Sequence, residues 1–184
     1  MSDYTIPRPA AGDITDLIAD DHRLFEELMR DMRDVSADRD GARSAFAAVL
    51  IAHSEAEEQA VYPKLVRRDV IEGEEEHHGE KEHAATNEAL LHLLQAKGTD
   101  TQKYEDALEA VAEVLNHHIG EEELTILNPA REDASEELRE QLGKSWSARR
   151  NALLEAGAGS IEQVESIVKQ AYDDGLLPND DQPS

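Results

Sequence analysis

The segment HSEAEEQAVYP, residues 53–63, has a counterpart in HIGEEELTILNP, residues 118–129, which begins 65 residues later in the chain. Each segment starts with a histidine that is followed four positions on by a glutamate. Because an α-helix makes one turn in 3.6 residues, this spacing places both side chains on the same helix face. In both segments a second glutamate follows directly, and the segment closes on a proline. The repeat predicts two helices that each present a His-Glu pair able to bind a metal ion.

The composition favours an all-α protein with one main core. The 184 residues are 39% apolar and 33% charged, and Ala, Leu and Glu are abundant whereas aromatic residues make up only 4%. This mixture favours helices, and the length suits one domain with an extension.

The net charge of −24, from 42 acidic and 18 basic residues, would repel phosphate backbones and anionic lipids. We therefore expect neither nucleic acid nor membrane as a partner. No signal-peptide pattern and no run of 18 apolar residues is found, which predicts a cytoplasmic protein. The chain contains no cysteine, so any metal must be held by histidine and carboxylate side chains.

The periodicity predicts four long helices, and their length and short connections favour an antiparallel up-down four-helix bundle with additional C-terminal helices. The first helix starts at Asp13 as N-cap, and the acidic stretch 72–79 is expected to be a connection or a frayed helix start. Two further helices are signalled by capping pairs at Asp133 and Ser160. The other expected long helices span residues 42–62, 80–96 and 101–127.

These elements divide the chain into four parts. We expect an irregular arm at 1–12, the bundle at 13–130, a helical extension packed on the bundle at 131–172, and an acidic tail at 173–184.

Each of the four long helices carries one histidine at an inward position, and two of them add a glutamate. On the fourth helix the inward positions advance by 4, 3, 4, 3 and 4 residues, the pattern of a bundle seam. Buried imidazole and carboxylate groups without partners are costly, so six of them need one another or a cation. The predicted metal ligands are His22, His53, Glu57, His83, His118 and Glu122.

A single inward histidine is more often a hydrogen-bonded core residue than a ligand, but four on four helices favour metal. The other four histidines (His77, His78, His92 and His117) fall off this face and are expected to be solvated or to lie behind the ligands. Nitrogen and oxygen donors with two carboxylates favour a pair of redox metals, two irons first of all, over structural zinc. A ferritin-like site fails, because it needs Glu-x-x-His on two helices and only Glu80 and His83 provide it.

The order His, His-x-x-x-Glu, His, His-x-x-x-Glu resembles the HHE cation-binding domain of the hemerythrin-like family over about residues 13–130. The longer C-terminal helices and the acidity look most like actinobacterial hemerythrin-like proteins. The resemblance implies two iron ions with a bridging oxo or hydroxo group, and it assigns the bridging role to Glu57 and Glu122. Where oxygen-carrying hemerythrins have a fifth histidine and an aspartate, this chain has Asn87 and Glu123.

Fewer histidine ligands favour turnover over reversible oxygen carriage. The leading hypothesis is thus a di-iron protein reacting with small oxidants under oxidative stress, with hydrogen peroxide first (catalase- or peroxidase-like) and nitric oxide next. The alternatives are a module that binds or senses O₂, NO or iron, an iron donor for damaged iron centres, and a helical interaction protein without metal. No catalytic acid or base is assigned, although Glu58, Glu80, His117 and Glu123 lie close in sequence to predicted ligands.

Overall fold

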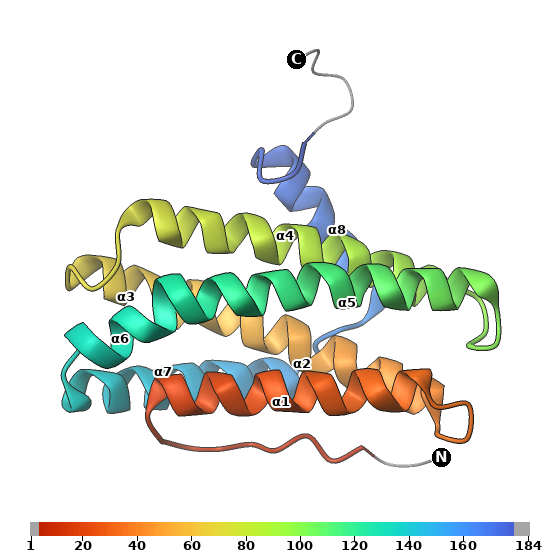
Figure 1. Cartoon of the computed structure of the whole chain (residues 1–184), viewed down its shortest axis with the longest axis horizontal. Helices are drawn as coiled ribbons and strands as arrows, with labels where there is room; N and C mark the ends of the chain where they lie inside the picture. Colours follow the sequence, from red (N-terminus) through yellow and green to blue (C-terminus); the bar gives the residue numbers. More distant parts are fainter. Residues whose placement is uncertain (1–3, 179–184) are drawn as a thin grey trace.

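Four long helices form the body of the protein in a computed structural model, which describes residues 4–178 (Figure 1). The described chain contains helices and turns and no strand, which confirms the all-α prediction. The elements, in order, are α1 (Ile14–Arg33), α2 (Arg39–Ala60), α3 (Tyr62–Arg67), α4 (Gly73–Gln95), α5 (Gln102–Glu122), the π-helical turn η1 (Glu123–Leu127), α6 (Asn128–Asp133), α7 (Glu136–Glu155) and α8 (Ile161–Asp173).

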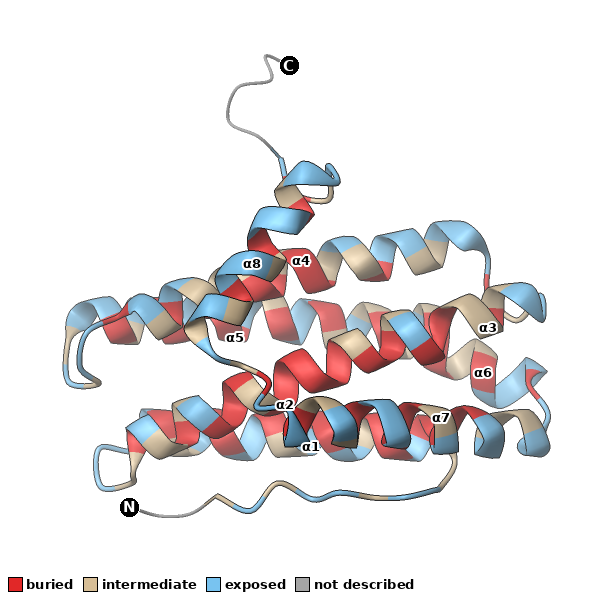
Figure 2. Ribbon diagram, turned by 180° about the vertical axis from the view of Figure 1, so that it is seen from behind, coloured by how far each residue is buried: buried red, intermediate tan, exposed pale blue. Residues whose placement is uncertain are grey.

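The bundle consists of α1, α2, α4 and α5. Contacts join α1 to α2, α2 to α4, α4 to α5 and α5 to α1, so that helices consecutive in sequence are neighbours in space. Helix α2 is buried along most of its length, because α7 covers the side that the other bundle helices leave open (Figure 2). Helix α8 lies across α4. The predicted bundle with additional C-terminal helices is therefore confirmed.

Most helix starts follow the capping residues in the sequence, with one error. Asp13, Thr101 and Ser160 each accept a hydrogen bond from a backbone N–H of the first turn, as N-caps do. Asp133 was predicted to begin the fifth helix, but it ends α6. Ser135 is the N-cap of α7 instead, because the helical turn that begins at Asn128 extends as far as Asp133.

Residues 73–79 of the acidic stretch 72–79 are helical and Glu72 is the N-cap, so the expected connection was wrong and the alternative, a helix start, is confirmed. Helix α4 begins at Gly73 and carries Glu74, Glu75 and Glu76 in its first turn. Negative side chains are favourable there, because the unpaired N–H groups give a helix N-terminus a partial positive charge. The run of glutamates therefore starts the helix.

In both repeat segments the regular α-helix is interrupted shortly before the proline. Helix α2 ends at Ala60 and α3 follows with Pro63 in its first turn. In the second repeat α5 passes into η1, and α6 follows with Pro129 in its first turn. Proline lacks the N–H that a continuing helix needs, which accounts for a break at the same place in both repeats.

Residues outside the bundle are fixed to it by polar contacts. The guanidinium of Arg150 on α7 donates to the carbonyl of Pro7, and Asn151 donates to that of Pro9, so the N-terminal segment lies along α7. The predicted arm and acidic tail are described only in part, since residues 1–3 and 179–184 lie outside the described range. No helix within residues 4–178 has the length and apolar character of a membrane span.

Helix α8 depends on a glycine at close approach. A Cβ at Gly159, where φ is +90°, would lie 2.5 Å from the backbone of Ala47 and Ala48 on α2, whereas Gly157, with φ +81°, has no atom within 4 Å of that position. Gly157→Ala is expected to lower the free energy of unfolding by about 1–2 kcal/mol through backbone strain alone. Gly159→Ala should cost about 1–3 kcal/mol more, because α8 must shift. Urea denaturation of both variants measures the difference, and equal losses would contradict the close packing.

Candidate metal centre

The six predicted ligands meet at the middle of the bundle, one or two from each of its helices. All six are buried, and none of these residues is more than 8% exposed. Their nitrogen and oxygen atoms form two groups, within each of which the atoms lie within 4.8 Å of one another. The first group is His22, His53 and Glu122, and the second is Glu57, His83 and His118.

Each glutamate touches histidines of both groups. Glu57 Oε1 lies 3.0 Å from His53 Nε2, and Glu57 Oε2 lies 3.3 Å from His83 Nε2. Glu122 Oε2 lies 3.2 Å from His22 Nε2 and 3.9 Å from His118 Nε2. The two groups are therefore joined by a pair of carboxylates.

Several of these buried atoms lack a hydrogen-bond partner. Within the described chain none is found for His22 Nε2, His53 Nε2, Glu57 Oε1 or Glu122 Oε2, although histidine and glutamate lie 3.0–3.2 Å apart. Buried polar atoms are normally paired, and each unpaired one costs free energy. Imidazole nitrogens and carboxylate oxygens are donors that suit iron, manganese or zinc. The donor set therefore fits metal ions.

Three of the histidines are held from behind by carboxylates. Nδ1 of His53 donates to Asp21 Oδ2 at 3.1 Å, Nδ1 of His83 to Glu58 Oε1 at 2.7 Å, and Nδ1 of His118 to Glu82 Oε2 at 3.0 Å. A carboxylate on Nδ1 fixes the tautomer and leaves Nε2 directed at the metal position. In each case the carboxylate comes from the preceding bundle helix.

Asp21 is itself held by the C-terminal extension. Arg150 on α7 is fully buried and donates to both of its oxygens, from Nε at 2.6 Å and from a terminal nitrogen at 2.7 Å. Trp146, also on α7, meets the ring of His53 edge to face, with centroids 5.7 Å apart. Helix α7 thus reaches the candidate centre through Asp21 and His53.

Tyr62 is a buried polar neighbour on the glutamate side. Its hydroxyl donates to Glu122 Oε1 at 2.8 Å and lies 3.3 Å from Glu57 Oε2, and its ring stacks on His83 with centroids 5.8 Å apart. Burial and the negative charges of Glu122 and Glu57 raise the pKa of Tyr62 well above its usual value. The phenol therefore stays protonated and donates to the two joined carboxylates.

Opposite charges offset the cost of burying these groups. Burial lowers the pKa of His53, but the charge of Glu57 and the hydrogen bond to Asp21 outweigh it and raise that pKa to about 9. Burial likewise opposes the effect of Glu57 and Glu58 on His83, whose pKa is raised to about 10. Burial raises the pKa of Glu57, but His53 and His83 reverse the effect and lower it. Metal ions and protons would compete for the same nitrogens.

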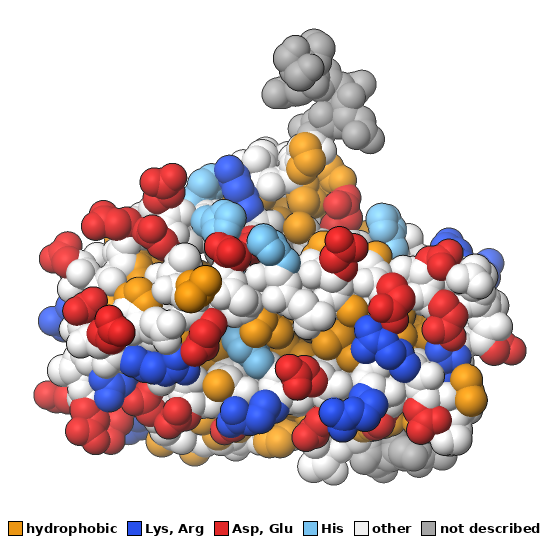
Figure 3. Space-filling view, in the orientation of Figure 1, with side chains coloured by type: hydrophobic (Ala, Val, Ile, Leu, Met, Phe, Trp, Pro, Cys, Tyr) orange, Lys and Arg blue, Asp and Glu red, His pale blue; other side chains and the backbone are white. Residues whose placement is uncertain are grey.

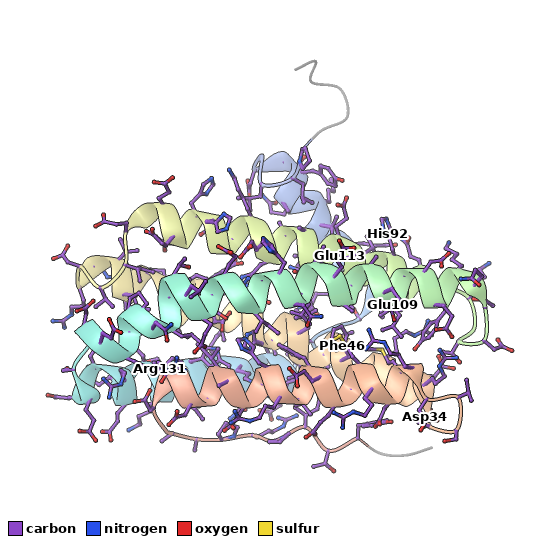
Figure 4. All side chains as sticks on the ribbon, viewed as in Figure 1. Asp34, Phe46, His92, Glu109, Glu113 and Arg131 are labelled. Carbon is purple, nitrogen blue, oxygen red and sulfur yellow. The ribbon has the colours of Figure 1, made fainter. Side chains whose placement is uncertain are left out.

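The remaining predicted neighbours lie outside the cluster. His77, His78, His92 and His117 are exposed, and His92 lies on the outer side of α4 (Figure 4). His117 Nε2 lies 3.3 Å from Glu82 Oε1, behind His118, whereas Glu123 forms an ion pair with Arg131.

Sequence reasoning missed Asp21, Tyr62, Glu82 and Arg150. Tyr62 lies beyond the end of α2, outside the helix periodicity. The carboxylates had one faint signal, since Asp21, Glu58 and Glu82 each directly adjoin a predicted ligand in the sequence.

Comparisons with known proteins found one matching family and one similar curated protein. A family model described as "Hemerythrin HHE cation binding domain" matches residues 13–130, the range that the resemblance covers. A curated protein of Nostoc sp. named DNA nickase is 26% identical over 143 residues, which are 76% of this chain. The chain spans 40% of the length of that relative. No solved structure matches.

Proposed function

Because the chain belongs to the hemerythrin HHE cation-binding domain family, whose domains bind metal ions, we propose that its six clustered residues hold two iron ions. In this proposal Glu57, Glu122 and an oxo or hydroxo group bridge the ions. The observation that carries it is the contact of each glutamate with histidines of both groups. One mononuclear site would leave half of these donors without a cation.

The number of donors supports reaction with small molecules. Each group contains two histidines, and two bridging carboxylates add two oxygens, which makes four protein donors for each ion. Octahedral iron takes six ligands, so positions stay available for exchange. Iron bound here would supply reversible one-electron redox chemistry, and we propose hydrogen peroxide as the leading substrate and nitric oxide as the next.

The surrounding residues hold the donors in place during such a reaction. Asp21, Glu58 and Glu82 keep the imidazole tautomers fixed. The hydroxyl of Tyr62 donates a hydrogen bond to Glu122, one of the two shared carboxylates. Disproportionation of two H₂O₂ gives two H₂O and one O₂, so it needs no external reductant. The proposed decomposition of hydrogen peroxide therefore needs no second substrate.

Purified protein is expected to contain about two Fe per chain, to absorb in the near ultraviolet, and to release O₂ from added peroxide. Glu82→Gln should lower the peroxide rate or the iron affinity roughly 10–100-fold, because His118 loses its charged partner. Glu74→Gln, on the exposed first turn of the same helix, is the matched control and should leave both unchanged.

Other outcomes would redirect the proposal. Less than about one Fe per chain would overturn it. Full iron content with a stable O₂ or NO adduct and no turnover would favour a binding or sensing module, and rapid transfer of iron to an acceptor protein would favour an iron donor.

We do not propose a nucleic-acid partner on the basis of the similarity to a DNA nickase. The chain spans 40% of that protein, and its net charge of −24 opposes binding to a phosphate backbone. On the face drawn in Figure 3 acidic side chains are widespread, and basic side chains lie among them along its lower half.

A further inference from the structure

A cavity of about 150 Å³ opens between α2, α4 and α8, close to the candidate centre. Its polar lining comes from all three sides: Glu55 and Glu58 from α2, Glu80 and Asn87 from α4, and Gln170 from α8, with Asp174 just beyond the end of that helix. The remaining lining residues are apolar.

The cavity concentrates negative charge. Four carboxylates line it, those of Glu55, Glu58, Glu80 and Asp174. Glu58 is paired with His83, but the hydrogen-bond and ion-pair partners of the other three are neutral or weak: Gln59 donates to Glu55 at 2.7 Å, Gln170 donates to Asp174 at 2.9 Å, and His77 lies 3.5 Å from Glu80. These contacts leave carboxylate charge that a cation would compensate.

A second observation also points to a ligand. Asn87 is only 5% exposed and lines the cavity, and its Oδ1 has no hydrogen-bond partner within the described chain. A buried amide oxygen without a partner is costly, and amide oxygens are common ligands of divalent cations.

The cavity is connected to the centre through Glu58. This residue lines the cavity and also accepts, at 2.7 Å, the hydrogen bond from His83 Nδ1. A cation in the cavity would thus lie one side chain away from a proposed iron ligand.

We propose that this cavity binds a hydrated divalent cation whose bound waters contact the oxygens of Glu55, Glu58, Glu80 and Asn87, and that Fe²⁺ occupies it before entering the centre. Oxygen ligands suit hard divalent cations such as Mn²⁺, and the borderline cation Fe²⁺ also accepts carboxylate ligands. Helix α8 forms the outer wall through Gln170 and Asp174. The entry role rests on the proposed function, whereas binding in the cavity does not.

Mn²⁺ titration of the iron-loaded protein, followed by the electron paramagnetic resonance signal of free Mn²⁺, tests the binding. About 0.15 M salt limits general attraction to the acidic surface, since the screening length is then about 8 Å. We expect one Mn²⁺ bound per chain in addition to the iron. Glu80→Gln and Asn87→Leu should each bind it at least tenfold more weakly, while Glu162→Gln, exposed in the first turn of α8, should match the unmodified chain.

The entry step is tested by adding Fe²⁺ to the metal-free protein without oxygen and counting chelator-resistant iron over time. Glu80→Gln and Asn87→Leu should fill at least tenfold more slowly. Absence of the additional Mn²⁺, or unchanged binding in both variants, would overturn the cavity site, and unchanged filling rates would overturn the entry role. Iron content at the end point separately reports on the proposed centre.

Discussion

Glu57→Ala is expected to remove iron from both positions of the centre together. Its two oxygens face His53 of one donor group and His83 of the other, at 3.0 and 3.3 Å. Loss of a partner behind a ligand already lowers metal affinity roughly 10–100-fold, so loss of a carboxylate shared by both ions should cost at least that at each. Iron analysis after dialysis should therefore fall from about two Fe per chain to well below one.

The matched control is Glu113→Ala, which removes an exposed carboxylate from α5, another helix that carries predicted ligands, outside both the ligand cluster and the cavity. It should retain full iron content in the same dialysis. Circular dichroism verifies that both variants keep their helices. Retention of one tightly bound iron by Glu57→Ala would contradict a shared carboxylate and would favour two independent sites.

Arg150→Met is expected to lower the free energy of unfolding of the metal-free protein by about 3–5 kcal/mol. Arg150 is fully buried and donates to both oxygens of Asp21, which is only 5% exposed. Without the guanidinium, Asp21 would keep a buried charge compensated by His53 alone. Urea denaturation of the metal-free form measures the loss without the added stabilisation from bound iron.

A double variant separates stability from metal binding. Asp21→Leu with Arg150→Met replaces the buried ion pair by apolar groups and should recover much of the lost stability. Iron affinity should stay reduced, roughly 10–100-fold, because His53 loses the carboxylate on Nδ1. If the free energy of unfolding of Arg150→Met lay within about 1 kcal/mol of that of the unmodified chain, the Asp21–Arg150 ion pair would contribute little to stability.

The bundle and the convergence of the six predicted ligands could be expected from sequence because both depend on helix periodicity. A histidine at a seam position points inward whichever helix lies opposite, so local spacing suffices. The metal-binding roles of these residues stay predictions. The partners behind the histidines could not be found in this way, since contacts such as Arg150 with Asp21 join residues 129 positions apart.

The helix starts show a similar division. Asp13 and Ser160 were identified because a capping residue acts on its own first turn. The start of α4 could not be decided in this way, because its glutamates look like a solvated connection unless their favourable position at a helix N-terminus is considered.

The π-helical turn η1 keeps the two repeats in phase although they differ in length. Pro63 lies six residues after Glu57, whereas Pro129 lies seven after Glu122. One additional residue in a regular α-helix would rotate everything after it by about 100°. A π-helical turn absorbs one residue as a local bulge.

Leu124 in this turn is 65% exposed, and its counterpart two residues after the glutamate of the first repeat, Gln59, is exposed as well. Beyond Leu124, Ile126 and Leu127 are each 1% exposed and correspond, counted back from the proline, to buried Ala60 and Val61. The additional residue is thus accommodated between two stretches that keep the same buried and exposed positions in both repeats. If equal numbers of residues were exchanged between the two repeat segments, the helical phase of the residues that follow each segment would shift. Helix α6 and the chain that leads to α7 would then turn away from the faces they now cover.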